Sequence, residues 1–251
     1  SYPSRVVRLI VPYPAGSGPD LLGRVVAQQL QSAMGQSVVV ENRSGALGMV
    51  GTAEVARAPG DGYTLLMTTN TTQAANVALV RNLAYDPVKD FVPITRITTG
   101  PMMLLVRADS PYTSVAELVR LGRGEKALSV GYGSAASQVS AAKVSTAGKL
   151  NVVYVPYKGI PPAVNDMLGG HLAFTFADLP VAVPMVRSGR ARGLGVTSTE
   201  RIASEPQIPA LAETFPGLEV IGWQGVVAPA GTPPQVVARL DEALRQGLRD
   251  R

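Results

Sequence analysis

The sequence predicts two α/β halves, each built around a sheet of parallel strands. Three observations carry this prediction. Strand-like apolar runs alternate with helical patterns, which is typical of βαβ units. The alternation restarts near residue 101, and a strand–turn–helix pattern returns after Gly222. We therefore expect one domain to comprise residues 1–100 and 221–251, and the other to comprise residues 101–220.

The first half begins with the apolar run "VVRLIVP", and further strands are expected at 37–42 and 63–69. Helices are expected at 21–35, where apolar residues recur on one stripe, and at 49–58, where "PGDG" ends the pattern. Between the first strand and the first helix lies "VPYPAGSGPD". Ser17 or Gly18 can cap that helix, and Pro19 fits its first turn.

The second half repeats the alternation. Strands are expected at 101–109, 127–133, 152–157, 172–178 and 191–198, and helices at 114–122, from "SAASQ" to Gly148, and at 162–170. Ser114 is the expected cap of the first of these helices. The segment "GWQGVVAPAGTPPQVVARL" then predicts a strand, a turn and a helix capped by Thr232, with Pro233 in its first turn.

Composition excludes several functions. The 251 residues include no cysteine and one histidine, His171, which removes disulfides, thiolate nucleophiles, most metal sites and most Ser–His catalysis. No apolar run approaches the ~18–20 residues that span a bilayer. The chain opens at "SYPSRVV" without a methionine, and we expect it to begin after a cleavage site or a similar boundary.

A formal net charge of +5 raises the question of nucleic acid. The basic residues are scattered, as in "RLGRGEK" and "RSGRARG", and aromatic residues make up only 5% of the chain. Nucleic-acid binding needs a basic cluster and stacking aromatics, so no nucleic-acid partner is expected.

Two loops lie between a strand and a helix and could receive an anion. The first is "PAGSGPD", since the first N–H groups of a helix lack internal partners and carry the positive end of its dipole. For this loop alone, a capped strand–helix turn without a ligand is the favoured reading. The second, "GYGSAASQ", resembles a dinucleotide fingerprint, but "LNVVYVPY" lacks the acid that would bind the ribose. Two such helix starts could together bind a ligand with two carboxylates, or one carboxylate end of a ligand.

Two acids, Asp20 and Asp178, each follow an expected strand and could face a cleft. Nothing in the sequence marks a nucleophile or a cofactor beside them. Asp20 equally suits a first-turn acid that complements the helix dipole, and Asp178 equally suits a loop acid that caps a turn. If Asp178 is ionised and reaches the ligand, it favours an amino dicarboxylate or a hydroxylated acid over a plain diacid. The loop "NRSGALGMVG" is interpreted as tight backbone packing rather than as a phosphate site.

Six blocks occur in one order along the chain: "VPYPAGSGPDLLGR", "VENRSGALGMVGTAEVARAPGDGYTLL", "LAYDPVKDFVPI", "YVPYKGIPPAVNDMLGG", "PMVRSGRARGLGVTS" and "GWQGVVAPAGTPPQVVARL". Together they resemble the Bug, or TctC-type, solute-binding proteins of tripartite tricarboxylate transporters. The resemblance implies a type II periplasmic binding protein, with two α/β domains around a ligand cleft. It also implies a monomer in the periplasm, its signal peptide removed, that captures a dicarboxylate, an acidic amino acid or an aromatic acid without a cofactor or metal. Partners would be membrane transporter subunits or a sensor protein.

The resemblance implies ligand contacts that are mainly backbone amides, hydroxyls and bridging waters. By position, the implied ligand-binding residues are Tyr13, Ala15, Gly16, Ser17, Asp20, Thr69, Asn70, Thr72, Ser134, Ala135, Ala136, Ser137, Tyr157, Ala177 and Asp178. The N–H groups of Ser17 and Ser137 are expected to face the ligand or its waters.

The chain departs from the family pattern at three positions. It has "AGSG" where many members have two glycines, and Val139 and Gln73 where many have histidine. These changes bear on the identity of the ligand. The chain also stops inside an expected helix, "LRQGLRDR", and we expect a truncated tail. The alternative from another class, an α/β enzyme acting on a nucleotide or acyl substrate, lacks a nucleophile elbow, a catalytic histidine and a ribose acid.

Overall fold

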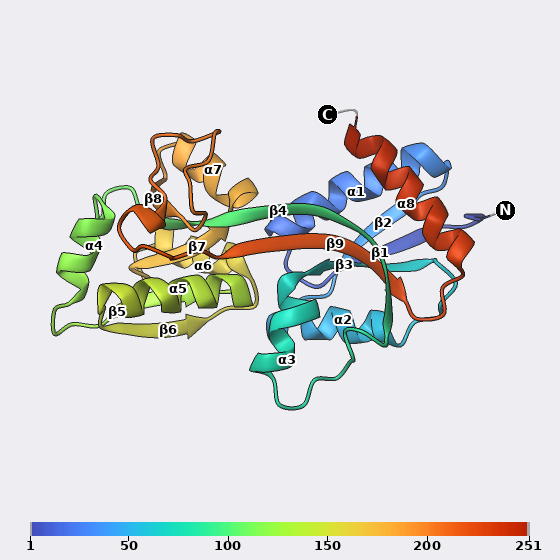
Figure 1. Cartoon of the computed structure of the whole chain (residues 1–251), viewed down its shortest axis with the longest axis horizontal. Coiled ribbons are helices and arrows are strands. Elements are labelled where there is room, and N and C mark those ends of the chain that lie inside the picture. The colour runs from blue at the N-terminus through green and yellow to red at the C-terminus, as the bar shows by residue number, and fades with distance from the viewer. Residues whose placement is uncertain (1, 250–251) are drawn as a thin grey trace. The chain divides into compact units, whose positions relative to one another are not determined.

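The computed structural model describes residues 2–249 and divides into two compact units (Figure 1). Unit 1 comprises Ser1–Thr98 and Trp223–Arg251, and unit 2 comprises Thr99–Gly222. Sequence reasoning placed the boundaries after residues 100 and 220. The observed boundaries fall inside two long strands, β4 (Phe91–Arg107) and β9 (Ile221–Pro229), so two segments of chain connect the units.

Unit 1 holds a mixed sheet with the strand order β2-β1-β3-β9-β4. β1 (Val7–Val11) pairs in parallel with β2 (Val38–Asn42) and β3 (Thr64–Thr69), and β3 pairs antiparallel with β9. The remaining elements are α1 (Gly18–Met34), η1 (Ala46–Gly48), α2 (Met49–Ala56), η2 (Thr71–Ala75), α3 (Asn76–Leu79) and α8 (Pro234–Arg249). The antiparallel β9 corrects the expectation of a wholly parallel sheet.

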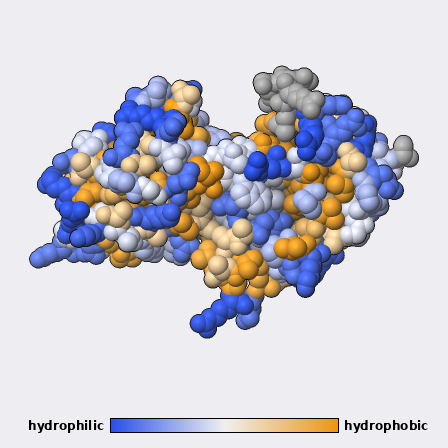
Figure 2. All heavy atoms as spheres, viewed as in Figure 1, coloured by the Kyte–Doolittle hydropathy of each residue, from blue (hydrophilic) through white to orange (hydrophobic). Residues whose placement is uncertain are grey.

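Both faces of this sheet are covered, which explains why β1 and β3 are apolar on both faces. Leu9 and Met67 lie in a core with residues of α1 and α8, whereas Ile10 and Leu66 lie in a second core with residues of α2. All four side chains are completely buried. Hydrophobic residues also reach the surface of unit 1 around α3, as Figure 2 shows.

Unit 2 holds a mixed sheet with the order β8-β4-β7-β5-β6. β5 (Leu128–Tyr132) pairs in parallel with β6 (Val152–Pro156) and β7 (Phe174–Asp178), whereas β4 runs antiparallel to β7 and β8 (Ala191–Val196). The helices are α4 (Val115–Gly122), α5 (Ala135–Gly148), α6 (Ile160–Leu168), α7 (Leu179–Arg187) and the short η3 (Leu211–Glu213). Phe174 and Phe176 anchor its core with ring centroids 6.3 Å apart in an edge-to-face arrangement.

Two expected helix ends differ in the structure. α5 ends with Gly148 as its last helical residue, and Lys149 takes the left-handed conformation with φ 53°. The final helix begins at Pro234, one position later than expected, because the Pro233 carbonyl already accepts the N–H of Val237. The hydroxyl of Thr232 donates to the Pro229 carbonyl, so it closes the preceding turn instead.

Candidate functional site

The loop between β1 and α1 holds two of its amides, those of Gly16 and Ser17, in internal hydrogen bonds. Ser17 is the N-cap of α1, and its hydroxyl oxygen accepts the Asp20 N–H at 3.3 Å. The Ser17 N–H donates to the Pro14 carbonyl, and the Gly16 N–H donates to the Asp20 carboxylate. In this loop and at the start of α1, the amides of Ala15 and Gly18 donate to no acceptor among the described residues.

The carboxylate of Asp20 lies inside unit 1, with only 2% of the side chain exposed. It accepts from the Gly16 N–H at 2.9 Å, from Asn42 Nδ2 at 2.9 Å, and from Arg24 Nε and Nη2 at 3.1 and 3.2 Å. Burial alone would raise its pKa, but the hydrogen bonds from Arg24, Gly16 and Asn42 lower the pKa below its ordinary value. Asp20 is therefore ionised at neutral pH, and both of its oxygens are used within unit 1.

The loop after β3 holds its threonine hydroxyls in a buried network. The Tyr13 hydroxyl lies 2.9 Å from Thr69 Oγ1, and Thr68 Oγ1 lies 2.8 Å from Thr72 Oγ1. Tyr13, Thr69 and Thr72 are all buried, at 5% exposure or less. Asn70 differs, because it is half-buried and its side chain makes no hydrogen bond within the described residues. It directly precedes η2, a π-helix, a geometry that is frequent at functional sites.

In unit 2, the start of α5 repeats the arrangement of α1. Ser134 is the N-cap, and it forms a capping box with Ser137, in which the hydroxyl oxygen of each serine accepts the backbone N–H of the other. The Ser137 N–H donates to Ser134 Oγ, so this amide too is used internally. The side chains of Ala135 and Ala136 are buried. Within the described residues the Ala136 amide donates to no protein acceptor.

Asp178 ends β7 in unit 2, at the edge of the sheet where α5 begins. Gly131 of β5 pairs with Thr175 of β7 in parallel, so the chain after β5 and the end of β7 run out at the same edge. Asp178 is half-buried, and no other described residue donates a hydrogen bond to its carboxylate. Burial raises the pKa of Asp178 to about 6. A carboxyl that accepts a hydrogen bond only from its own backbone N–H among the described residues is therefore poised to titrate near neutral pH.

The two remaining predicted residues are held within unit 2. The Tyr157 hydroxyl donates to Asp166 Oδ2 at 2.6 Å, and burial followed by this hydrogen bond raises the pKa of Tyr157 to about 12. Ala177 is completely buried in β7, opposite Met103 of β4. Ala177 can offer a ligand only its backbone.

The structure thus separates the predicted residues into two groups. The side chains of Tyr13, Ser17, Asp20, Thr69, Thr72, Ser134, Ser137 and Tyr157 make hydrogen bonds inside their own unit. The groups left available are backbone amides of the helix starts and the side chains of Asn70 and Asp178. Sequence reasoning missed Asn42, although a polar residue at the end of an apolar strand was the signal that could have found it.

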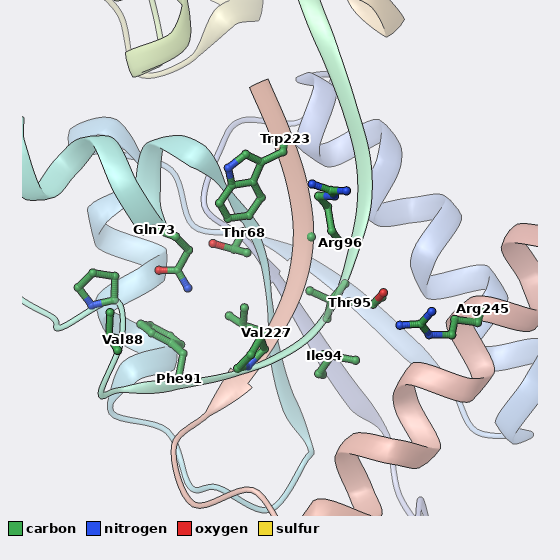
Figure 3. Close-up of a pocket in the computed structure, with 14 residues that line it drawn as sticks. Thr68, Gln73, Val88, Phe91, Ile94, Thr95, Arg96, Trp223, Val227 and Arg245 are labelled. Carbon is green, nitrogen blue, oxygen red and sulfur yellow. The ribbon is translucent and has the colours of Figure 1, made fainter. Parts of the chain in front are cut away.

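A pocket of about 660 Å³ lies elsewhere in unit 1 (Figure 3). Its wall is largely apolar, with Phe91, Ile94 and Val227, and it includes two cations, Arg96 and Arg245. In Figure 3, Phe91 and Ile94 lie on opposite sides of β9, which agrees with their places in different cores. None of the predicted ligand-binding residues lines this pocket.

The described residues provide no group of three or more histidine or acidic side chains that could hold a metal ion. None of the described helices combines the length and the apolar character that crossing a membrane requires.

Solved structures define the class to which this fold belongs. The structure titled R. palustris Rpa4515 with adipate has a TM-score of 0.94 and 35% identity, covering 97% of this chain and 83% of that chain. MatC from Rhodopseudomonas palustris with bound malate has a TM-score of 0.92 and 31% identity, covering 98% and 85%. Among curated proteins, BugT of Bordetella pertussis is 33% identical over 258 residues, covering 100% of this chain and 78% of BugT. The fold is that of a periplasmic binding protein.

The family follows from the sequence match. The model of TctC, the tripartite tricarboxylate transporter family receptor, matches residues 22–250. The chain therefore belongs to the TctC family. The family and the fold implied by the six sequence blocks are confirmed.

Proposed function

We propose that this protein is a periplasmic solute-binding protein that captures a small organic carboxylate and passes it to a membrane transporter or a sensor. The observation that carries the proposal is the set of unpartnered amides at two helix starts, those of Ala15 and Gly18 in unit 1 and of Ala136 in unit 2. Helix N-termini favour negative charge, and an amide that lacks a protein acceptor can bind an anion at no internal cost. The adipate and malate of the two structural relatives support a carboxylate as the ligand.

We infer that the contacts are non-covalent and that no reaction follows. The groups left available in the two units are amides, the Asn70 carboxamide and one carboxyl, and none of these is an activated nucleophile. The alternative of an α/β enzyme acting on a nucleotide or acyl substrate has no observation in its favour. Transport partners and the monomeric state remain inferences from the family.

We propose that Asp178 determines which carboxylates the protein prefers. An ionised carboxylate at this position repels a ligand carboxylate and accepts a hydrogen bond from an ammonium or hydroxyl group. We therefore expect glutamate and malate to bind more tightly than succinate at pH 8, and the Asp178→Asn variant to reduce this preference. Charge-assisted hydrogen bonds contribute about 1.5–3 kcal/mol, or roughly ten- to a hundredfold in affinity.

The test compares variants that delete an amide with variants that keep it. Gly18→Pro removes the N–H at the first position of α1, where proline is favoured, and Ser17 already has the extended backbone that a residue before proline prefers. Ala136→Pro removes the Ala136 N–H at the second position of α5. Proline stands at the same position of α1, α6 and α7 in this chain. The matched controls, Gly18→Ala and Ala136→Gly, retain the amides.

Calorimetry with malate, adipate, glutamate, succinate, benzoate and ATP gives the readout. We expect a carboxylate to bind the wild type, ATP not to bind, and each proline variant to lose at least tenfold in affinity while its control stays within threefold. At a hundred times its Kd, the ligand should add ~2.7 kcal/mol to the apparent free energy of unfolding. Equal affinity of the proline variants and their controls would refute the assignment of the amides, and binding of ATP alone would refute the proposed class of ligand.

A further inference from the structure

We propose that Asn42 is a positioning residue of the β1–α1 loop, which it holds through the Tyr13 carbonyl and Asp20 in the conformation that leaves the Ala15 and Gly18 amides free. The inference rests on the proposed function, since it concerns how that site is shaped. It assigns no ligand contact to Asn42 and removes Asp20 from the candidate ligand contacts. We call Asn42, Asp20 and the Gly16 amide the loop brace.

The position of Asn42 follows from the register of the sheet. Asn42 is the last residue of β2 and pairs with Val11, the last residue of β1, so it lies where the loop leaves the sheet. Its Nδ2 group donates one hydrogen bond to the Tyr13 carbonyl at 3.0 Å and another to Asp20 Oδ1 at 2.9 Å. Both hydrogens of one amide group therefore tie the start of the loop to the first turn of α1.

The Asp20 carboxylate completes the brace at the middle of the loop. Its Oδ2 accepts the Gly16 N–H at 2.9 Å and so turns that amide into the protein. Gly16 has φ +79°, and no atom lies within 4 Å of the space that a Cβ would fill there. Side-chain packing therefore does not restrain Gly16, and a glycine with this freedom costs much entropy to order. The hydrogen bond to Asp20 supplies the restraint that packing does not.

The loop brace would favour binding because it holds the β1–α1 loop in its binding conformation before the ligand arrives. A loop that is already ordered before the ligand arrives loses less conformational entropy on binding, so its amides bind more tightly. Within the described residues, the Asp20 carboxylate bonds to the loop backbone only at the Gly16 N–H. Asn42 fixes one of its oxygens and the Tyr13 carbonyl at the same time.

Arg24 provides a matched control. It also donates to both oxygens of Asp20, at 3.1 and 3.2 Å, but 56% of its side chain is exposed and it makes no recorded bond to the loop backbone. Because the Arg24 guanidinium lies at the surface, water can reach the Asp20 oxygens when Gln replaces it, whereas Asn42 holds the carboxylate from inside the unit. If any loss of an Asp20 partner disturbed the site, Arg24→Gln and Asn42→Ala would act alike.

The test has one arm without ligand and one with ligand. In the first arm, hydrogen exchange of the Gly16 amide is measured by NMR in the wild type, Asn42→Ala and Arg24→Gln. We expect at least a tenfold faster exchange in Asn42→Ala and less than a threefold change in Arg24→Gln. In the second arm, calorimetry with malate and adipate should show at least a tenfold loss of affinity for Asn42→Ala and less than threefold for Arg24→Gln.

The variant Asn42→Asp separates positioning from general destabilisation. It keeps the shape of the side chain but places a second carboxyl beside Asp20, and two carboxylates that share a site raise the pKa of one of them. When the introduced carboxyl is protonated, it can donate to Asp20 or to the Tyr13 carbonyl again. Affinity for the same acids should therefore recover in Asn42→Asp between pH 8 and pH 5 relative to the wild type, and should not recover in Asn42→Ala.

The outcomes distinguish this inference from the proposed function. Unchanged Gly16 exchange in Asn42→Ala would overturn the brace, as would equal effects of Asn42→Ala and Arg24→Gln on affinity. Faster Gly16 exchange in a protein whose wild type binds neither acid would retain the brace as the device that shapes the loop. That result would count against the proposed function.

Discussion

Asp178 is the residue whose chemistry differs most from its surroundings. Its carboxyl ends a buried strand and has no donor from another described residue, in contrast to Asp20, which has four donor contacts. The same kind of side chain therefore has its pKa raised to about 6 in one unit and lowered in the other. The surroundings of each aspartate, and not the residue type, therefore decide which carboxyl is available to a ligand.

The raised pKa gives a prediction for stability. A carboxyl whose pKa is higher in the folded than in the unfolded protein stabilises the fold when protonated, and this contribution is lost as the pH rises through about 6. Replacing Asp178 by Asn keeps the shape and removes the charge. We expect urea unfolding of Asp178→Asn to show a higher free energy of unfolding than the wild type at pH 8, with the difference vanishing near pH 4. A difference that is the same at both pH values would contradict this account.

At this scale, the sequence predicted the helix caps better than the hydrogen bonds around them. The spacing of glycine, proline and serine in "PAGSGPD" correctly identified a capped helix start. It could not show that the Ser17 N–H donates to the Pro14 carbonyl and that the amides left free are those of Ala15 and Gly18. Which of several adjacent amides is free depends on the tilt of each peptide plane, and residue types do not encode that tilt locally. The role of Asn42 depends on strand register, which joins residues distant in the sequence.

Among the elements, the helix ends show two solutions to one problem. α1 closes at Gly35 with φ 72°, whereas α5 closes at Lys149 with φ 53°. The left-handed conformation costs a residue with a Cβ roughly 1–2 kcal/mol, while glycine adopts it freely. Lys149 therefore lowers the stability of the C-terminal end of α5, whereas Gly35 stabilises the C-terminal end of α1.

Exchange of the two cap residue types should have opposite effects on stability. Lys149→Gly should raise the free energy of unfolding by up to about 1 kcal/mol, because Lys149 is exposed and relief of strain outweighs the added freedom of the unfolded chain. Gly35→Ala should lower it by about 1 kcal/mol, since no atom lies near the added Cβ and only the conformation is penalised. Chemical denaturation measures both. Changes of the same sign in the two variants would show that cap conformation does not set these stabilities.

The elements themselves were largely predictable, because apolar runs and caps are local signals. The strands and long helices of both units lie where the periodicity placed them, mostly within two or three residues. Several features were not foreseen, among them the π-helix at Thr71–Ala75, the short α3, the early start of β4 at Phe91, and α7 directly after β7. α7 carries an internal proline, Pro184, which normally disfavours a helix. The first part of β4 contains Pro93 and several exposed residues, so it lacks the apolar run that marks Met102–Val106 as a strand.

At the scale of the whole molecule, the two units have separate cores. The core of unit 2 is formed entirely by residues between Met102 and Leu218, whereas the cores of unit 1 combine residues from both ends of the chain. Unit 2 is one continuous segment, Thr99–Gly222, and unit 1 needs two segments. The units therefore differ in the number of chain segments that form them, although both have a mixed sheet with helices.

This difference predicts the behaviour of excised segments. Residues 99–222 expressed alone should fold, because the segment contains five sheet strands and a complete core. Residues 1–98 alone should not, because β3 loses β9, its antiparallel neighbour, and the core loses α8. Cooperative thermal unfolding by circular dichroism and dispersed NMR spectra provide the test. A folded 1–98 segment or an unfolded 99–222 segment would contradict the division.

The pairing of β3 with β9 also sets the order in which a growing chain can finish its parts. The six residues of β3 are all buried in the finished protein, yet their partners on β9 are Gln224–Val227, near the other end of the chain. During synthesis, unit 2 is complete while one edge of β3 is still without its strand, and unpaired apolar strands are prone to aggregation. Unit 1 is thus completed after unit 2, and the interval between the synthesis of β3 and that of β9 is when a nascent molecule most needs a chaperone.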